Sequence, residues 1–305
     1  MKCVKCGKKA VQSGFCRSHF LSYFEQKVRK TIRRFRLISP KDKMAVAVSG
    51  GKDSTVLLYV LRRLGYNVDA ITVDAVIGNY TKKNLKNLRE VCGKHGIKLH
   101  ELSFREEFGY SLCYLRDVLK ANGHSFSSCM LCGILRRYLL NKYARTLGFD
   151  CIATGHTLDD EAQAVLMNIF RNDQTRLLRQ GPVSGLKESP HFVRRIKPLY
   201  LCAEAETTAY SKIMRFPVQY TRCPCSVNAY RKDFRDFLEG FSRKQPDVCN
   251  KIVNFYIDTI LPLKEIEKTA SCSVGTCELC GEPSSRSVCR KCQLVLAMKD
   301  RGKSI

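Results

Sequence analysis

The sequence predicts an α/β fold with a parallel sheet, flanked by a small metal-binding module at each end of the chain. Between residues 45 and 170, short apolar runs alternate with longer helical patterns. This order is typical of a parallel sheet with helices on both faces. A glycine-rich turn follows the first apolar run, and paired cysteine ligands lie near both termini. A chain of 305 residues can bury one large core with small appendages.

The first module is predicted at residues 1–24, where four potential ligands have the spacing of a zinc site. Cys3-x2-Cys6 and Cys16-x2-His19 are two close pairs separated by nine residues. Four soft ligands in this pattern form a closed, tetrahedral zinc site. The 17 cysteines of the chain favour metal binding over disulfides in a cytosolic protein.

The central part, residues 25–268, carries the alternating pattern. Strands are expected at 45–48, 69–73, 98–102 and 151–154, and helices at 55–64, 81–95, 134–146 and 158–170, with Gly96 and Gly148 ending the second and third helices. Residues 181–190 are expected to form a loop, and residues from about 200 to 268 to be mainly helical. Ligands of such sheets bind at the carboxyl ends of the strands.

The turn Ser49-Gly50-Gly51-Lys52-Asp53-Ser54 connects the first strand to its helix. Its glycines let backbone N–H groups face an anion, while the helix N-terminus and Lys52 add positive potential. The spacings of the common P-loop and of the dinucleotide-binding turn are absent. We therefore expect a phosphate cradle of another kind; the alternative is an ordinary strand-to-helix turn.

Polar residues follow two further strands. Asp74 ends the second strand, and Thr154-Gly155-His156 follows the strand at 151–154. Asp159 and Asp160 begin the next helix, where they are candidates to bind the magnesium of a nucleotide or to position a substrate. The alternative is that they cap the helix, since the helix dipole favours carboxylates there.

A third group of cysteines lies within the central part. Cys129-x2-Cys132 opens a helix, and Cys223-Pro224-Cys225 lies far along the chain. Two cysteines and a distant third provide three ligands. A closed zinc site needs four, whereas a [4Fe–4S] cluster with three ligands leaves one iron open for chemistry. A redox-active dithiol and a third zinc site are the alternatives.

The second module is predicted at residues 269–305. Cys277-x2-Cys280 and Cys289-x2-Cys292 repeat the zinc spacing with four thiolates, and Cys272 is an alternative ligand. The remaining cysteines are expected to be buried, inert thiols: Cys92, Cys113, Cys151, Cys202 and Cys249.

The charge of the chain points to a polyanionic partner. Lys and Arg number 53 against 28 Asp and Glu, which gives a net charge of +25, with basic stretches at 27–43 and 171–235. Such a surplus repels itself unless a polyanion neutralises it, so nucleic acid is the expected partner. A solvated basic surface is the alternative. Without a signal segment or an apolar run of ~20 residues, the protein is expected to be cytoplasmic with no membrane partner.

Taken in order, these motifs resemble the tRNA 2-thiouridine synthetases. The turn at 49–54 is similar to the PP-loop of N-type ATP pyrophosphatases. The terminal ligand pairs, Cys129-x2-Cys132-Gly133 and Cys223 narrow the resemblance to the group that includes TtuA and NcsA. Segments 132–137 and 154–168 look closest to its archaeal wobble-uridine branch. The resemblance covers almost the whole chain, from Cys3 to Cys292.

The resemblance implies a Rossmann-like PP-loop domain between two zinc modules, usually dimeric. It places a [4Fe–4S] cluster on Cys129, Cys132 and Cys223. It implies that ATP with Mg²⁺ binds at Val48, Ser49, Gly50, Gly51, Lys52, Asp53, Ser54, Asp74, Arg136, Gly155 and His156. Catalytic roles fall on Lys52, Asp53, Arg136, Asp159 and Asp160.

The chain departs from the family pattern at two positions. Some relatives have lysine where Arg136 stands. Because arginine stays protonated, it cannot act as a base, and Arg136 is expected to hold phosphate charge. Cys225 stands where relatives usually have tyrosine, which leaves open whether Cys223 or Cys225 is the third ligand.

The reaction implied by the resemblance is ATP-dependent adenylation of the C2 oxygen of a tRNA uridine, followed by its replacement with sulfur. Uridine 34 is the expected target. Uridine 54 of the T-loop, or a cluster-free relay through cysteine persulfides and a disulfide, are the alternatives. The implied partners are tRNA, a second copy of the chain, and a sulfur donor, either sulfide or a ubiquitin-like thiocarboxylate carrier protein. An adenylating ligase without sulfur chemistry and a non-catalytic RNA-binding protein are rival classes.

Overall fold

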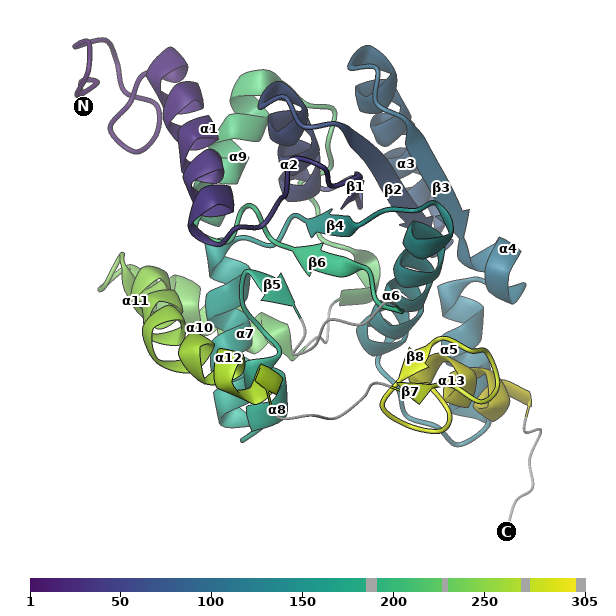
Figure 1. Ribbon diagram of the computed structural model, residues 1–305. Helices are drawn as coiled ribbons and strands as arrows, with labels where there is room; N and C mark the ends of the chain where they lie inside the picture. Colours follow the sequence, from purple (N-terminus) through teal and green to yellow (C-terminus); the bar gives the residue numbers. More distant parts are fainter. Residues whose placement is uncertain (185–190, 227–229, 270–274, 300–305) are drawn as a thin grey trace.

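A computed structural model of the chain describes residues 1–184, 191–226, 230–269 and 275–299. At its centre lies a six-stranded sheet in the order β3-β2-β1-β4-β6-β5 (Figure 1). The strands are β1 (Met44–Ala47), β2 (Val68–Asp74), β3 (Leu99–Ser103), β4 (Cys151–Thr154), β5 (Val183–Ser184) and β6 (Arg194–Ile196). All pairs are parallel except β5 with β6. The predicted α/β fold with a mostly parallel sheet is therefore confirmed.

The edge of the sheet differs from the prediction. Val183 and Ser184 form β5 within a segment that was expected to be a loop, and β6 was not predicted. Residues 185–190 of that segment lie outside the described part of the chain. Strands of two and three residues are too short to show an alternating pattern, and two arginines begin β6.

Helices cover both faces of the sheet (Figure 1). The α-helices are α1 (Arg17–Arg34), α2 (Lys52–Arg63), α3 (Gly78–Lys94), α4 (Phe104–Phe108), α5 (Leu112–Ala121), α6 (Ser128–Thr146), α7 (Leu158–Phe170), α8 (Gln174–Leu178), α9 (Glu204–Met214), α10 (Arg231–Ser242), α11 (Val248–Phe255), α12 (Leu261–Thr269) and α13 (Arg290–Lys299). A 3-10 turn, η1 (Pro224–Ser226), and a π-helical segment, η2 (Tyr256–Ile260), complete the helical elements. The expected helical region after residue 200 is confirmed.

The alternation of side chains along β1 divides the core into two layers. Met44 and Val46 face a cluster that contains Phe20 of α1 and Tyr210 of α9. Ala45 faces the opposite cluster, which contains residues of α5 and α6. A third cluster joins α7, α10 and α11. The two buried faces explain why the strands read as continuous apolar runs.

The N-terminal ligand group and the α/β domain share one helix. His19 lies in the first turn of α1, and Phe20, Phe24 and Val28 of the same helix are buried in the main core. The predicted boundary at residue 24 falls inside this continuous helix. At the other end of the chain, β7 (Gly275–Thr276) and β8 (Pro283–Ser284) form a small hairpin, and α13 packs against α5 and α6. None of the helices within the described residues has the length and apolar character needed to cross a bilayer.

Candidate active site

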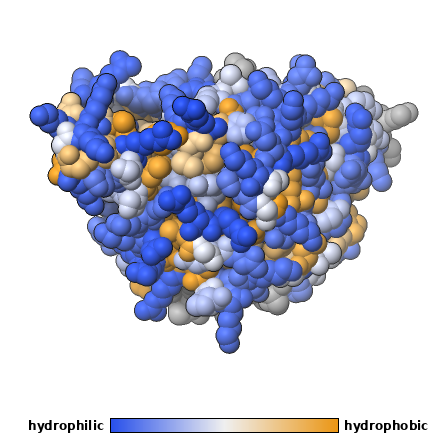
Figure 2. Space-filling model, turned by 90° about the horizontal axis from the view of Figure 1, so that it is seen from above, coloured by the Kyte–Doolittle hydropathy of each residue, from blue (hydrophilic) through white to orange (hydrophobic). Residues whose placement is uncertain are grey.

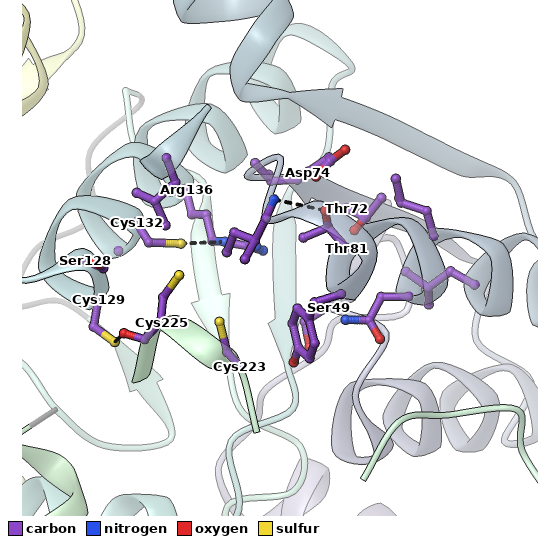
Figure 3. A pocket seen from close by; sticks show the side chains of 18 residues that line it. Ser49, Thr72, Asp74, Thr81, Ser128, Cys129, Cys132, Arg136, Cys223 and Cys225 are labelled. Carbon is purple, nitrogen blue, oxygen red and sulfur yellow. Dashed lines mark hydrogen bonds between the residues drawn. The ribbon is translucent and has the colours of Figure 1, made fainter. Parts of the chain in front are cut away.

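Ser49 of the phosphate turn and the central cysteines line one cavity of about 370 Å³ (Figure 3). The other residues of the turn, together with Val48, Gly155 and His156, do not line it. Ser49 reaches it from the end of β1, and Asp74 from the end of β2. From α6 come Cys129, Cys132 and Arg136, and from η1 and the residue before it come Cys225 and Cys223. Segments that are far apart in the sequence therefore meet at the carboxyl ends of the strands, where open α/β sheets bind ligands.

The geometry of the turn at 49–54 requires its first glycine. Gly50 has φ +79°, and a Cβ added there would lie 2.6 Å from the Cβ of Asn84. The turn is fixed by Ser54, whose Oγ accepts a hydrogen bond of 3.2 Å from the Ser49 N–H. The N–H of Gly51 donates to Ser49 Oγ at 3.4 Å. Because α2 begins at Lys52, the turn stands at the positive end of a helix dipole, as an anion cradle needs.

Lys52 is held at the start of α2 by two carboxylates. Its Nζ lies 2.9 Å from Asp53 Oδ2 and 2.8 Å from Glu204 Oε1. Thr207 of α9 also donates a hydrogen bond to Asp53. Burial alone would lower the pKa of Lys52, but Asp53 and Glu204 outweigh it and raise the pKa. Lys52 therefore keeps the positive charge that a phosphate site requires.

The loop after β4 packs against the phosphate turn. A Cβ added at Gly155 would lie 2.7 Å from the backbone nitrogen of Ser54, so a larger residue there would push the turn away. The next residue, His156, is oriented by a 2.9 Å contact between its Nδ1 and Thr154 Oγ1. Because glycine has no Cβ, the two strand-end loops can approach each other closely at Gly155.

Asp159 and Asp160 have structural partners and do not line the cavity. Asp160 Oδ2 accepts from the Thr157 N–H at 3.1 Å, and Asp160 Oδ1 accepts from Arg231 at 3.2 Å. Asp159 Oδ2 accepts from the Glu204 N–H at 2.6 Å, at the start of α9. The contact with Thr157 is the helix-capping alternative for Asp160, whereas Asp159 caps the start of α9 and not its own helix. Burial would raise the pKa of Asp160, but its interactions with His156 and Arg231 lower it overall. Burial also lowers the pKa of His156 itself.

The central cysteines come from two rigid turns. Ser127 caps α6 by accepting the Met130 N–H at 3.3 Å, which places Cys129 and Cys132 in the first turns of this helix. The Cys129 thiol donates to the Cys225 carbonyl at 3.6 Å, and Arg136 Nε donates to Cys132 Sγ at 3.0 Å. Arg136 therefore lies beside Cys132 in the wall of the cavity (Figure 3).

The cysteine groups fall into two kinds by spacing. Among the described residues, two groups have all their ligand atoms within 4.8 Å of one another: Cys3, Cys6, Cys16 and His19, and Cys277, Cys280, Cys289 and Cys292. Both can bind a single metal ion. Cys272 lies outside the described residues. The central thiols line a cavity without meeting that spacing, so their donor set fits a larger thiolate-bound cluster better than one ion.

One of the cysteines expected to be inert is not isolated. Cys92, Cys151, Cys202 and Cys249 are buried, as expected, but Cys113 is only half-buried. Its thiol lies near the Cys225 thiol.

Sequence reasoning missed the residues that shape the rest of the cavity. Asn84 and Tyr80 of α3 line it, and Gln219 donates to Asn84 Oδ1 at 2.7 Å. Glu204, the partner of Lys52, lies about 150 residues away in sequence. None of these belongs to a motif. The close approach of Gly50 to Asn84 could not be inferred before the fold was known.

Two arginines near the cysteines lack an acidic partner among the described residues. Arg195 of β6 donates from Nη2 to the Arg137 carbonyl of α6 at 3.0 Å. Burial and the neighbouring Arg137 lower the pKa of Arg195 to about 10. Burial also lowers the pKa of Arg137, which lies near Cys132 and Arg176. Positive groups that repel each other in this way are stabilised by an anion.

Comparisons with known proteins agree with this site. A PP-loop domain family matches residues 21–220. The tRNA-5-methyluridine(54) 2-sulfurtransferase of Pyrococcus horikoshii is 33% identical, over 96% of this chain and 93% of its own. The cytoplasmic tRNA 2-thiolation protein 1 of Anopheles gambiae is 31% identical, over 96% of this chain and 88% of its own.

A solved structure is similar over nearly the full length. It is the U34-tRNA thiolase NcsA of Methanococcus maripaludis with its [4Fe-4S] cluster, at 29% identity and a TM-score of 0.79, covering 99% of this chain and 97% of that one. The expected resemblance is confirmed: the chain belongs to the PP-loop family of tRNA 2-thiolation enzymes.

Proposed function

We propose that the protein is a tRNA-uridine 2-sulfurtransferase, which uses ATP to activate the C2 oxygen of a uridine and then replaces that oxygen with sulfur. One observation carries the proposal most directly. Ser49, the first residue of the phosphate turn, lines the same cavity as the central cysteines, so the groups that the two halves of this reaction need lie next to each other. Membership of a family of tRNA 2-thiolation enzymes supports the same reaction.

The chemistry balances without net oxidation. The uridine C2 oxygen attacks the α-phosphorus of ATP, a C–O–P bond forms and pyrophosphate leaves. A sulfur nucleophile at the oxidation level of sulfide then adds to C2. The C2–O bond breaks and AMP leaves with the oxygen. The protein must therefore stabilise phosphate charge in the first step and deliver sulfur in the second.

The phosphate half is assigned to the turn at 49–54. Its backbone N–H groups and Lys52 would hold the phosphates of ATP with Mg²⁺, with Val48, Asp74, Gly155 and His156 around the nucleoside. Arg136 would neutralise charge on the side that faces the cysteines, where its guanidinium already contacts Cys132. Asp53, Asp159 and Asp160 are the proposed carboxylates, one of which would contact magnesium or position the uridine base. The present partners of Asp159 and Asp160 give both a structural role as well.

The sulfur half is assigned to the central cysteines. Cys129, Cys132 and Cys223 would hold a [4Fe–4S] cluster, and the similar NcsA structure, which was solved with its own [4Fe-4S] cluster, supports such a group. When bound, an iron with an open position supplies a Lewis-acidic site for a sulfur ligand. The chain's own contribution is to hold three thiolates in one wall of the cavity. Arg136 adds a positive charge there.

Partners and further metals follow from the same proposal. tRNA is the substrate, and sulfide or a ubiquitin-like thiocarboxylate carrier is the sulfur donor. Zinc would occupy the two terminal ligand groups, because four soft ligands at this spacing suit it. We also propose a homodimer that works in the cytoplasm. Uridine 34 is the proposed target because the similar NcsA is named as a U34-tRNA thiolase, whereas a relative of comparable identity is named for uridine 54.

An anaerobic thiolation assay tests the proposal. The reconstituted protein is incubated with ATP, Mg²⁺, sulfide and either of two tRNA transcripts, one lacking uridine 34 and one lacking uridine 54. Mass spectrometry of the nucleosides then measures 2-thiouridine. We expect 2-thiouridine only in the transcript that retains uridine 34, with AMP formed in step. Thiolation that requires uridine 54 would reassign the target, and no AMP with either transcript would reject the reaction.

Two variants in the first turn of α6 distinguish the sulfur half of the reaction from ATP binding. Cys129→Ala should abolish thiolation and leave ATP binding intact, because Cys129 lines the sulfur side of the cavity. Met130→Ala is the matched control, since this neighbouring side chain is 43% exposed and does not line the cavity. Full thiolation by Cys129→Ala would rule out the cluster. Iron and acid-labile sulfide in the wild-type protein distinguish the cluster from a persulfide relay.

A further inference from the structure

We propose that Cys225 supplies a fourth thiolate to the central cavity and closes the coordination position that Cys129, Cys132 and Cys223 would leave open. The proposal rests on the iron–sulfur centre of the proposed function and extends it. The sulfur donor would then have to displace Cys225, so this residue would control when the centre accepts sulfur.

The position of the Cys225 side chain carries the argument. Cys225 lines the same cavity as the other three cysteines. Figure 3 shows the four thiols pointing toward a common space, with the sulfur of Cys225 between those of Cys132 and Cys223 in that view. The Cys225 thiol lies near the Cys223 thiol. A set of four thiolates is the usual ligand set of a [4Fe–4S] cluster.

The backbone around Cys225 fixes this position. Ser226 donates to the Cys223 carbonyl from its N–H at 3.0 Å and from its hydroxyl at 2.6 Å, which closes the 3-10 turn η1. Proline between the two cysteines fixes one backbone dihedral of the turn. The Cys129 thiol also bonds to the Cys225 carbonyl at 3.6 Å. Cys223 and Cys225 are therefore presented together, from one turn that is tied to α6.

The ligand exchange that follows balances without a redox partner. With a cluster bound, Cys225 would give up its position to a sulfide or thiocarboxylate sulfur, and the released thiolate would take up a proton from the incoming donor or from water. No electrons are transferred.

Spectroscopy of the reconstituted full-length protein tests the proposal. Iron and acid-labile sulfide are measured, and the electron paramagnetic resonance spectrum of the reduced cluster is recorded during titration with sodium sulfide. In the wild type we expect about four iron atoms per chain and a spectrum that changes only at high sulfide. Cys225→Ala should keep its iron, and its spectrum should shift at a much lower sulfide concentration.

Two further variants make the outcome decisive. Cys113→Ala, a thiol next to Cys225 but outside the cavity, should titrate like the wild type. Cys223→Ala should lose iron. Circular dichroism and ATP binding check that each variant is folded. A Cys225→Ala titration identical to that of the wild type overturns the proposal. Loss of iron from Cys225→Ala with retention in Cys223→Ala also overturns it, because Cys225 would then be the third ligand. A wild type without iron would instead reject the cluster itself.

Discussion

Two glycines of the site are required because of what lies beside them. A Cβ at Gly50 would meet Asn84 at 2.6 Å, and a Cβ at Gly155 would meet the Ser54 nitrogen at 2.7 Å. The Gly155 contact is with backbone, which cannot rotate out of the way as a side chain can. The shape of the phosphate turn therefore depends on a residue about a hundred positions away in sequence.

Gly155→Ala should weaken ATP binding by about tenfold or more, which corresponds to ~1.4 kcal/mol, because the added methyl group displaces the turn at Ser54. Isothermal titration with ATP measures the change. Gly93→Ala is the matched control. Gly93 lies in α3 with nothing within 4 Å of its Cβ position, so alanine should stabilise the protein by ~0.5–1 kcal/mol and leave ATP affinity unchanged. Equal ATP affinity in both variants would contradict the packing argument.

The lowered pKa of the Asp160 carboxyl predicts how the stability of the protein depends on pH. Its pKa is lowered in the folded protein, since His156 and Arg231 outweigh the effect of burial. A lowered folded-state pKa stabilises the protein above the unfolded value of about 4, and this contribution is lost as the pH falls through the folded-state pKa. Asp160→Asn should lower the free energy of unfolding by roughly 1.5 kcal/mol at pH 7, the low end for bonds to charged groups because Arg231 is partly exposed.

Urea unfolding of both proteins between pH 3 and pH 7 measures this difference. We expect the gap between wild type and Asp160→Asn to narrow below about pH 4. A constant gap across the whole range would show that the lowered pKa of Asp160 does not contribute to stability.

At the scale of elements, α1 is the clearest case of a helix hidden from the sequence pattern. Its buried residues Phe20, Phe24, Val28 and Ile32 recur every four positions, but the basic residues between them, such as Lys27 and Arg29, give the segment the character of a charged run. By contrast, α7 has the bounds that the sequence predicted, since acidic residues fill its first turn and a long apolar period follows.

The same comparison explains which parts of the site were predictable. The motifs at Ser49–Ser54 and Cys129–Cys132 each lie within a few consecutive residues, so they can be recognised without knowledge of the fold. The pairing of Lys52 with Glu204, or of Cys225 with Cys113, joins different elements. Such contacts depend on how α9 packs against α2 and how η1 is placed next to α5. The packing of distant elements cannot be predicted from short sequence motifs.

Phe24→Ala should lower the free energy of unfolding by ~3–5 kcal/mol, since the side chain is fully buried and its ring centroid lies 5.0 Å from that of Tyr210. Because the loss occurs within α1, exchange of its amide hydrogens should also speed up near His19. Gln26→Ala, an exposed position on the same helix, should change stability by no more than about 0.5 kcal/mol. A small effect of Phe24→Ala would mean that α1 does not join the N-terminal group to the core.

At the scale of the whole molecule, the net charge of +25 favours binding to a polyanion such as tRNA. Figure 2 shows hydrophilic side chains over most of the face seen from above. Several arginines have acidic partners, such as Arg89 with Glu101 and Arg194 with Asp42. Arg137 and Arg195, in contrast, have none among the described residues, and they lie beside the cysteine end of the cavity.

The affinity for tRNA should fall by ~10³–10⁵ between 50 and 200 mM salt if six to ten phosphates are contacted. Arg195→Gln should weaken binding and reduce the slope of log K against log salt by about one, as expected for one lost phosphate contact. Arg89→Gln is the control, because that guanidinium is already paired with Glu101 at 2.7 Å. Filter binding at several salt concentrations measures both. Equal slopes for the two variants would exclude Arg195 from the RNA interface.

The exposure of Cys129 bears on how sensitive the protein is to oxygen. Solvent that reaches Cys129 carries dioxygen, and in the proposed cluster dioxygen would attack an iron that lacks a protein ligand. A chain with a spare thiol at that position would tolerate brief aeration better than one with tyrosine. Under the proposed function, Cys225 would therefore make the thiolation of tRNA less sensitive to oxygen.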